Sequence, residues 1–371
     1  MKEKLYSKTH SLVNLSSSIL KHYGIEPFHT TIPEIDDILK RAGKTNICVI
    51  LFDALGKQVR HSLLNEKDSL IRHEVLDITS VFPPTTVAAT SAFLSARYPY
   101  ENGWLGWRQH FNDLNVTIDM FSNRISYTDS KLKTQLSYER CSYTSILDLI
   151  NETKKYKAYH IAPEHIIPNG PKSLNEFFKH IDYKVKGDNQ FIYAYWDDPD
   201  HVLHDFGIMS PQSKNIVKRI NSSIAKLAKK NPQTLFIIIS DHDIIDITFI
   251  DMEDYKDLYE MIEYKPSVDS RALMLKIKGG NIEKFKELFK KYYDINEFLL
   301  YTKEEIITNE VFGFGQKHKE FDNFMGDLLI ISLTDKTFLV RDDDGSPCNF
   351  KAAHSGGTKQ ESIISISIYN Q

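Results

Sequence analysis

Short apolar segments recur along this chain, and they constrain its fold more than any other feature. The segment NICVILF is apolar at almost every position, without the alternation of a strand that has one face in water. Such runs are typical of parallel strands that are buried on both faces. We predict five core strands, at Asn46–Phe52, Ile78–Phe82, Lys157–Ile161, Gln190–Trp196 and Thr234–Ser240.

Segments with helical periodicity lie between these strands. Apolar residues recur at helical spacing within residues 8–23, and Thr31-Ile-Pro-Glu34 has the composition of a capped helix start, with Gly43 as the stop. Further helices are predicted at Thr86–Ala96 and Pro211–Lys230. Strands that alternate with helices indicate the α/β class, with a mostly parallel central sheet covered by helices on both faces.

Two regions do not follow this alternation. Residues 108–140 are polar and rich in Asn, Ser and Tyr, and we expect them to form a cap over the site. Residues 245–345 are expected to form a small α+β insertion with a strand at Ala272–Ile277, a helix at Ile282–Tyr293 and a hairpin at Leu328–Val340. The chain then returns to the core at Ala353–Tyr369, so that residues 1–371 constitute a single α/β domain.

The overall charge and the lengths of the apolar runs exclude two classes of partner. The chain of 371 residues has a net charge of −4, which provides no basic surface to gather a nucleic acid polymer. Leu235–Ile239 is among the longest apolar stretches and is far shorter than a membrane span. A small molecule is therefore the expected partner, with no nucleic acid polymer and no membrane.

The first residues and the cysteines indicate a compartment. Met1–Thr9 is polar and carries three lysines, and no apolar core of a signal peptide follows it. Cys48, Cys141 and Cys348 are widely separated, which favours a reducing compartment and no disulfide framework. We therefore expect a cytoplasmic protein.

Residues with the chemistry of a metal site occur at intervals along the chain. Asp53 and the pair Asp241-His242 each follow an apolar strand. Asp200 and His204 are four residues apart, so one helical turn places both on one face. Imidazoles and carboxylates together suit zinc. The candidate ligands are Asp53, Asp200, His204, Asp241, His242 and His354.

Thr86 is the candidate nucleophile. It stands where Phe82-Pro-Pro-Thr-Thr86 enters a predicted helix, so free backbone N–H groups and the positive end of the helix dipole lie beside it. Both suit a phosphate group. A threonine hydroxyl is a poor nucleophile at neutral pH, and a bound cation can lower its pKa.

Each of these residues also has a simpler explanation when it is taken alone. An Asp after a strand is commonly a turn former, and a Thr-Thr pair before a helix is commonly a cap. An Asp and a His four residues apart more often form a solvated helix face than a ligand pair. Only the ordered combination of all these residues supports a site.

That combination resembles the type I phosphodiesterase/nucleotide pyrophosphatase branch of the alkaline phosphatase superfamily. FPPTTVAATSAFLSARYPYENGWLGW (82–107) is similar to the family's nucleophile segment, in which a Thr lies thirteen residues before a Pro. Counting back from Pro99 gives Thr86 rather than Thr85. YAYWDDPDHVLHDFG (193–207) is similar to the family's Asp-x3-His-x2-Gly segment. Phe312-Gly-Phe-Gly315, Met325-Gly-Asp327 and the final His-x-Gly are also similar, and the resemblance covers roughly Ile47–Ser365 without the cap.

The resemblance implies an alkaline-phosphatase-like fold with two divalent metal ions, Zn²⁺ first and Mn²⁺ as the alternative. It implies that Asp200, His204 and His354 hold one ion, which would activate the water that hydrolyses the intermediate. It implies that Asp53, Asp241 and His242 hold the other. Thr86 would also be a ligand of that second ion, which would activate it.

Three positions depart from the family's pattern. Trp107 stands where many pyrophosphatases of the family have an Asn that contacts a phosphoryl oxygen, and we assign Trp107 to substrate binding. Trp104 and Trp107 have flat faces that suit a base or another apolar leaving group. Ala54 follows Asp53, and Asp243 follows Asp241-His242, at positions where Gly is usual.

We therefore predict a two-metal phosphoester hydrolase that forms a covalent phospho-Thr86 intermediate. The predicted activity is that of a phosphodiesterase or nucleotide pyrophosphatase on nucleotide-like or other small phosphodiesters. A phosphomonoesterase of the alkaline phosphatase type and a phosphonate hydrolase are alternatives on the same scaffold. A sulfatase needs a Cys or Ser in a C/S-x-P-x-R setting, which no cysteine here has. A non-catalytic metal or nucleotide sensor is a more remote alternative, because no ligand or nucleophile is missing.

Overall fold

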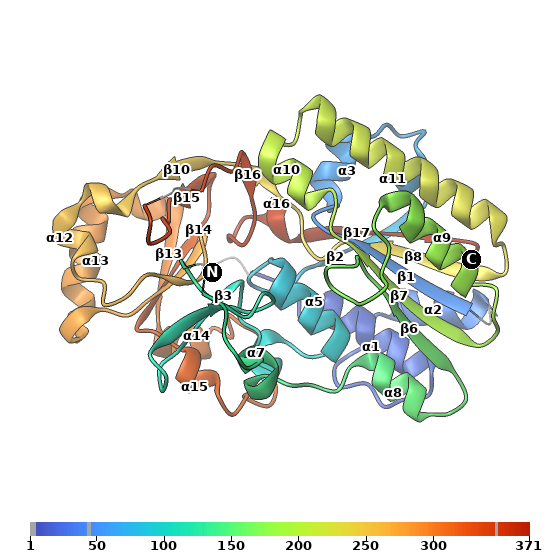
Figure 1. Ribbon diagram of the computed structural model, residues 1–371, viewed down its shortest axis with the longest axis horizontal. Coiled ribbons are helices and arrows are strands. Elements are labelled where there is room, and N and C mark those ends of the chain that lie inside the picture. Colours follow the sequence, from blue (N-terminus) through green and yellow to red (C-terminus); the bar gives the residue numbers. More distant parts are fainter. Residues whose placement is uncertain (1–4, 43–45, 129, 346–347) are drawn as a thin grey trace.

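A six-stranded sheet forms the core of the protein (Figure 1). The structure, a computed structural model, describes residues 5–42, 46–128, 130–345 and 348–371. The strand order is β2-β17-β8-β1-β7-β6. The strands are β1 (Asn46–Phe52), β2 (Glu74–Thr79), β6 (Lys157–Ile161), β7 (Gln190–Trp196), β8 (Thr234–Ile239) and β17 (Ile363–Tyr369). β8, β1, β7 and β6 are parallel, whereas β17 is antiparallel to both of its neighbours. The predicted mostly parallel α/β fold is confirmed.

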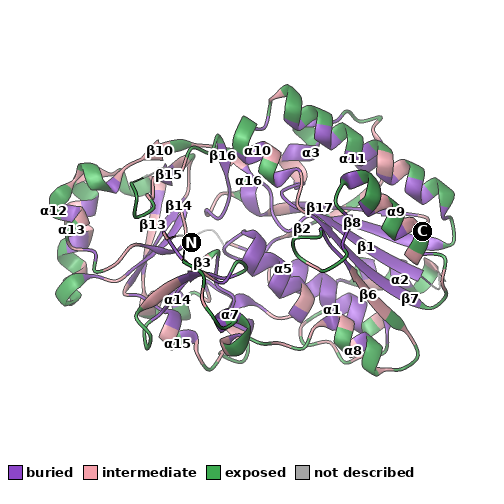
Figure 2. Cartoon of the chain, in the orientation of Figure 1, coloured by how far each residue is buried: buried purple, intermediate pink, exposed green. Residues whose placement is uncertain are grey.

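Helices cover both faces of this sheet, and its inner strands β8, β1 and β7 are buried between them (Figure 2). One side carries α1 (Leu12–His22), α2 (Pro33–Ala42), α5 (Thr86–Ser95) and α8 (Ile146–Glu152), and the other α3 (Lys57–Leu63), α9 (Leu174–Lys184) and α11 (Pro211–Lys230). Successive residues of β1 pack on opposite sides. Ile47 belongs to the apolar cluster of α1, α2 and α5, and Cys48 to that of α3, α9 and α11. This two-sided burial explains why β1 is apolar throughout.

A second, antiparallel sheet lies beside the core, with strand order β13-β14-β12-β11-β3-β4-β5. Its strands are β3 (Arg108–Phe111), β4 (Val116–Asp119), β5 (Arg124–Ile125), β11 (Ser267–Asp269), β12 (Ala272–Leu275), β13 (Phe298–Thr302) and β14 (Leu328–Ser332). Strands from residues 108–140 and from residues 245–345 therefore share one sheet. The roles of these regions as cap and insertion stay predictions.

Short elements complete the chain. The helices are α4 (Ser69–Arg72), α6 (Pro99–Asn102), α7 (Leu136–Arg140), α10 (Asp200–Phe206), α12 (Lys256–Tyr259), α13 (Ile282–Tyr292), α14 (Lys303–Thr308), α15 (Phe321–Phe324) and α16 (Lys359–Ser362). The strands are β9 (Ile245–Asp246), β10 (Thr248–Ile250), β15 (Lys336–Phe338) and β16 (Ala352–Ala353). Gly43, the predicted stop of α2, lies outside the described residues. No helix within the described ranges is long and apolar enough to cross a membrane.

One predicted strand and one predicted hairpin differ from the structure. The strand predicted at Ile78–Phe82 is β2, which begins at Glu74 and ends at Thr79, before the two prolines that follow Phe82. β2 is an edge strand of mixed polarity, so its first residues lack the apolar signal. The hairpin predicted at Leu328–Val340 is wrong, because β15 pairs in parallel with β10. The guanidinium of Arg271 lies in this turn and donates to the carbonyls of Thr334 and Lys336.

Candidate active site

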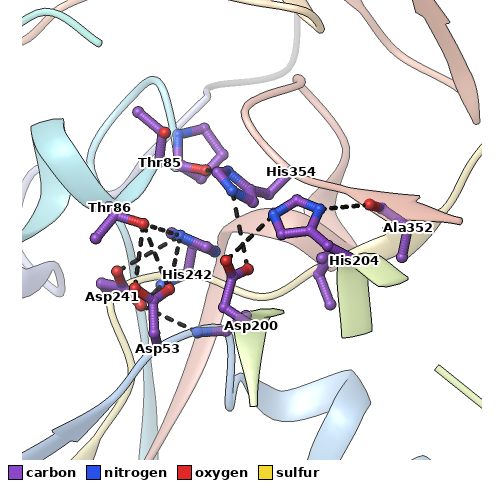
Figure 3. A network of polar contacts seen from close by, with 12 residues as sticks. Asp53, Thr85, Thr86, Asp200, His204, Asp241, His242, Ala352 and His354 are labelled. Atoms are coloured by element: carbon purple, nitrogen blue, oxygen red, sulfur yellow. Dashed lines mark hydrogen bonds and ion pairs between the residues drawn. The ribbon is translucent and has the colours of Figure 1, made fainter. Parts of the chain in front are cut away.

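The predicted site residues come together where the parallel strands end (Figure 3). Asp53 follows the last residue of β1, and Asp241-His242 follow β8 after one serine. α10 begins at Asp200 shortly after β7 ends, and Thr86 is the first residue of α5. Because the carboxyl ends of parallel strands share one edge of a sheet, loops distant in sequence meet there.

The first group of candidate ligands consists of Asp200, His204 and His354. Their ligand atoms all lie within 4.8 Å of one another, and all three residues are buried. One turn of α10 separates the first two, and His204 Nε2 lies 3.2 Å from Asp200 Oδ2. His354 Nε2 lies 3.9 Å from Asp200 Oδ1. We call this group the His354 triad.

The second group consists of Asp53, Asp241 and His242, here called the His242 triad, and its ligand atoms also lie within 4.8 Å of one another. His242 Nε2 is 3.3 Å from Asp53 Oδ1 and 3.4 Å from Asp241 Oδ2. Thr86 Oγ1 lies 3.2 Å from Asp53 Oδ2 and 3.3 Å from His242 Nε2. The predicted nucleophile therefore touches this triad.

The two triads form one continuous site. The imidazole rings of His242 and His354 stack with their centroids 3.9 Å apart. The rings of His204 and His354 are 5.2 Å apart. Figure 3 shows the three imidazoles and the carboxylates facing a common centre beside Thr86.

Backbone carbonyls fix the orientation of all three imidazoles. A carbonyl only accepts hydrogen bonds, so each Nδ1 carries its proton and each Nε2 keeps a free lone pair that faces the site. Ligand histidines in metal sites are commonly oriented in this way. The pairs are His204 Nδ1 with Ala352 O at 2.7 Å, His242 Nδ1 with Asp243 O at 3.1 Å and His354 Nδ1 with Pro84 O at 3.1 Å.

Crowded carboxylates perturb the ionisation of the site. Burial, and then repulsion from Asp241 and Asp200, raises the pKa of Asp53 well above its usual value. Burial, and then repulsion from Asp200, raises the pKa of Asp241 to about 7. Burial lowers the pKa of His242 to about 3. The two raised pKa values reflect buried carboxylates crowded together, which a bound cation would relieve, and the lowered pKa of His242 keeps its imidazole in the neutral form that binds a metal.

The donor set fits divalent cations. Asp200 Oδ1 and Asp241 Oδ2 are buried and have no hydrogen-bond partner among the described residues. A buried carboxylate oxygen without a partner is costly, and a metal ion satisfies it. Three imidazole nitrogens and three carboxylates, divided between two triads, are donors that zinc and manganese both accept.

Tyr195 is a site residue that the sequence analysis missed. Its hydroxyl donates to Asp53 Oδ2, and the residue lies on β7 with its side chain on the α5 side of the sheet. The hydrogen bond holds the carboxylate that contacts Thr86. The strand QFIYAYW contains two tyrosines, so the sequence alone did not single out Tyr195.

Thr85 occupies the N-cap position of α5, but its side chain does not cap the helix. Its hydroxyl donates to Asp269 Oδ2 at 3.0 Å. Asp269 ends β11, so this bond ties the segment before the nucleophile to the second sheet. The two adjacent threonines thus differ, because only Thr86 contacts a triad.

The two tryptophans have different environments. Trp107 is 37% exposed and lies edge-on to Phe121, with ring centroids 6.5 Å apart. Its contact with substrate stays a prediction. Trp104 is 1% exposed, and its Nε1 donates to Cys141 O at 2.7 Å. The prediction that Trp104 offers a flat face to a leaving group is wrong, because the ring is enclosed by the protein.

The two positions that lack the family's usual glycine have structural explanations. Ala54 has φ of 54°, a left-handed conformation that favours glycine, and its N–H donates to Asp241 Oδ1 at 3.2 Å. The carboxylate of Asp243 accepts hydrogen bonds from the N–H groups of Gln58 and Val59. Asp243 therefore caps α3 from the loop after β8, which carries Asp241 and His242.

Residues 48–357 match the family described as type I phosphodiesterase / nucleotide pyrophosphatase. Among solved structures, murine ectonucleotide pyrophosphatase / phosphodiesterase 5 has a TM-score of 0.63 at 15% identity, with 87% of each chain covered. An inactive variant of that murine protein in complex with AMP (16% identity) and the human protein (14%) give the same TM-score and coverage. These similarities confirm the fold. No curated protein sequence is significantly similar to the chain.

Proposed function

Because the chain belongs to the type I phosphodiesterase/nucleotide pyrophosphatase family of the alkaline phosphatase superfamily, we propose that it hydrolyses small phosphodiesters with Thr86 as the nucleophile. The enzyme is a hydrolase, and its family is metal-dependent. The observation that carries the proposal is the position of Thr86 Oγ1, 3.2 Å from Asp53 Oδ2 at the first residue of a ten-residue helix.

Two divalent cations are the proposed cofactors, with zinc first and manganese as the alternative. The His354 triad would hold one ion, and the His242 triad with Thr86 would hold the other. Such ions supply electrophilic stabilisation to the attacking and leaving oxygens of a phosphoryl transfer. The unpartnered carboxylate oxygens of Asp200 and Asp241 support this assignment.

The start of α5 would orient the phosphoryl group. Its first helical hydrogen bond runs from Ala89 N to Thr85 O at 2.9 Å. The N–H groups of Thr86, Val87 and Ala88 precede it and have no partner within the helix. They are suited to a phosphoryl oxygen, on which negative charge accumulates during the reaction.

Thr86 would take part in two successive steps of the reaction. In the first step a bond forms from Oγ1 to phosphorus, the bond from phosphorus to the leaving oxygen breaks, and the threonine proton is lost to solvent. In the second step water adds to phosphorus, the bond from phosphorus to Oγ1 breaks, and the hydroxyl is restored. Before the attack, the contacts of the Thr86 hydroxyl with Asp53 and His242 hold Oγ1 in place.

A nucleotide is the proposed substrate class. A structural relative, the inactive variant of the murine protein, was solved in complex with AMP. Trp107, which is 37% exposed, is the proposed aromatic contact for such a substrate. The proposed reaction hydrolyses a nucleotide-like or other small phosphodiester to an alcohol and a phosphomonoester.

Adjacent threonines provide a matched test of the nucleophile. Thr86→Ala should lower kcat on a nucleoside 5′-nitrophenyl phosphate by several orders of magnitude, because the attacking oxygen is lost. Thr85→Ala loses only the bond to Asp269 and should cost far less. Thr86→Ser should keep part of the activity. Acid quenching during turnover, followed by mass spectrometry, should find the nucleoside monophosphoryl group of the substrate on Thr86.

Two outcomes would contradict this assignment in different ways. If Thr85→Ala is the more damaging substitution, the nucleophile has been placed one residue too late. If neither substitution matters and no covalent adduct with the nucleoside monophosphoryl group forms on Thr86, water attacks the substrate directly. The hydrolase activity of the family would remain in both cases.

A further inference from the structure

A buried ion pair between Arg271 and Glu361 lies outside both triads and takes no part in the proposed reaction. Arg271 directly precedes β12 in the second sheet, and Glu361 lies in α16, just before β17 of the central sheet. Nε and Nη2 of the arginine donate to Oε1 and Oε2 of the glutamate at 2.7 and 2.9 Å. Both side chains are 0% exposed. The bidentate geometry fixes the orientation of both groups.

The remaining donors of Arg271 attach it to the second sheet. Nη1 donates to Lys336 O at 2.9 Å and to Thr337 Oγ1 at 3.0 Å, and Nη2 donates to Thr334 O at 2.6 Å. All five N–H groups of a guanidinium are thereby engaged. The arginine is a fixed part of the turn between β14 and β15.

Two of the remaining contacts of Glu361 lead to the candidate metal site, and the others join it to Thr358, whose Oγ1 donates to Oε2 at 2.6 Å. Its Oε1 accepts a hydrogen bond from Gly356 N at 2.8 Å, and its backbone carbonyl accepts one from Asp243 N at 2.8 Å. Gly356 lies two residues after His354, and Asp243 directly follows His242. The side chain of Glu361 therefore holds the segment of one triad, and its main chain holds the segment of the other.

The segment around His354 fits closely against the ion pair. A Cβ atom on Gly356 would lie 2.6 Å from Arg271 Nη2 and 2.8 Å from Glu361 Oε2. On its other side the segment is bound to Pro84, whose carbonyl accepts hydrogen bonds from Ser355 N at 3.0 Å and from His354 Nδ1 at 3.1 Å. The imidazole is thus held between the nucleophile loop and the ion pair.

We propose that Arg271 and Glu361 are positioning residues that place His354 against Asp200 and His204 and thereby set the cation affinity of the His354 triad. The cation part of this statement rests on the proposed function. Loss of the Glu361 carboxylate releases Gly356 N and leaves the Arg271 charge buried without its partner. The bond from Asp243 to the Glu361 backbone does not depend on that side chain. The His242 triad should therefore keep its geometry.

Glu361→Met and the double variant Arg271→Met/Glu361→Met test the proposal, because methionine has no oxygen that could accept from Gly356 N. The double variant removes both buried charges, so it should fold even where the single variant is unstable. Lys276→Met is the control. It removes the ion pair between Lys276 and Asp327, which also lies beside β12 but contacts neither triad. Hydrogen exchange is measured first on metal-free protein. Peptides covering residues 353–358 should exchange faster in both Glu361 variants than in wild type, while peptides from β1 and β7 should exchange at the wild-type rate. Every peptide of the Lys276→Met control should also exchange at the wild-type rate.

Zinc titration of the same proteins gives the second measurement. Loss of a residue that orients a metal ligand commonly lowers affinity by about 10–100-fold. We expect this loss for one of the two ions in the Glu361 variants, with the other ion bound as in wild type. A merely structural role would weaken both ions together.

The outcomes separate this proposal from the proposed function. Unchanged exchange at residues 353–358, or faster exchange over the whole chain, overturns the positioning role. Two unchanged zinc affinities, or two that fall equally, overturn the link to the His354 triad. If exchange responds as expected but wild type binds no cation, the positioning of the segment stands and the metal-dependent function is what fails.

Discussion

Gly56 lies against the side chain of Asp243 so closely that a Cβ atom at position 56 would be 2.4 Å from Asp243 Cβ. The same carboxylate accepts hydrogen bonds from the first N–H groups of α3, from Gln58 and Val59. Asp243 directly follows His242, so this contact joins the loop after β8 to the loop after β1. The absence of a side chain at position 56 allows the two ligand-bearing loops to meet.

Gly56→Ala and Ala54→Gly should therefore have opposite effects. The new methyl group in the first variant displaces Asp243, and overpacking of this kind costs about 1–3 kcal/mol of stability. Ala54 has φ of 54°, a conformation that costs a non-glycine residue roughly 1–2 kcal/mol, so glycine there should be neutral or slightly stabilising. Urea unfolding of the two variants checks this. A Gly56→Ala protein as stable as wild type would show that Asp243 does not pack tightly against position 56.

The second prediction concerns metal content. Two triads of buried ligands imply two ions per chain, and protein purified without chelator should contain close to two equivalents of zinc or manganese by elemental analysis. An ion at 100 times its dissociation constant stabilises the fold by about 2.7 kcal/mol, so chelation should lower the unfolding temperature. His354→Ala should weaken the site of Asp200 and His204 most. One equivalent or none, after incubation with excess metal, would contradict the two-site assignment.

The third prediction concerns acid stability. His110 is buried in the second sheet, its ring stacks on Tyr264 with centroids 3.7 Å apart, and burial lowers its pKa to about 4. The unfolded chain binds a proton at this residue below pH of about 6.5, whereas the folded chain binds it only below about 4. Stability should therefore fall as the pH drops through this window, by up to about 1.4 kcal/mol per pH unit.

His110→Phe keeps a ring on Tyr264 and removes the titrating group. Its unfolding free energy, measured in urea on metal-free protein between pH 4 and 7, should depend less on pH than that of wild type. The variant also loses the hydrogen bond to Thr117, so a constant loss at all pH values is expected. Equal pH dependence in the two proteins would mean that His110 is not held neutral.

The sequence predicted the parallel core well because burial on both faces leaves a local signal. β1, β6, β7 and α11 have the bounds expected from the sequence. β2 was misplaced because an edge strand with one solvated face lacks that signal. The hairpin prediction failed because β15 pairs with the distant strand β10, and β14 pairs with β12 and β13. Contacts of this kind depend on tertiary packing and leave no local trace.

The residues of the candidate site also fall into those that the sequence could predict and those that it could not. The ligands and Thr86 could be proposed because each stands at the end of a strand or the start of a helix, where chain topology brings loops together. Tyr195 and the Arg271–Glu361 pair could not, because they act through hydrogen bonds to residues 142 and 90 positions away. Residues that orient others are recognised only when the packing is known.

The last prediction concerns charge at the substrate. A phosphomonoester carries nearly two negative charges at neutral pH, and a diester carries one. Within the described ranges, Thr86 and the residues of the two triads have no hydrogen bond or ion pair with a lysine or arginine side chain. Arg97, the first cation after Thr86, instead faces Glu101 at 3.6 Å and lies 3.9 Å from the ring centroid of Phe28.

The next arginine does not supply the missing charge either. Arg108 lies 4.7 Å from the ring centroid of Tyr127 and 3.8 Å from a carboxylate oxygen of Asp119, which offsets its charge. Among the described residues, a second negative charge on the phosphate thus meets no lysine or arginine that is bonded to Thr86 or to a triad. We expect a higher kcat/KM for a nucleoside 5′-nitrophenyl phosphate than for nitrophenyl phosphate under the same metal conditions. A clear preference for the monoester would refute the diesterase assignment and leave the chemistry of Thr86 standing.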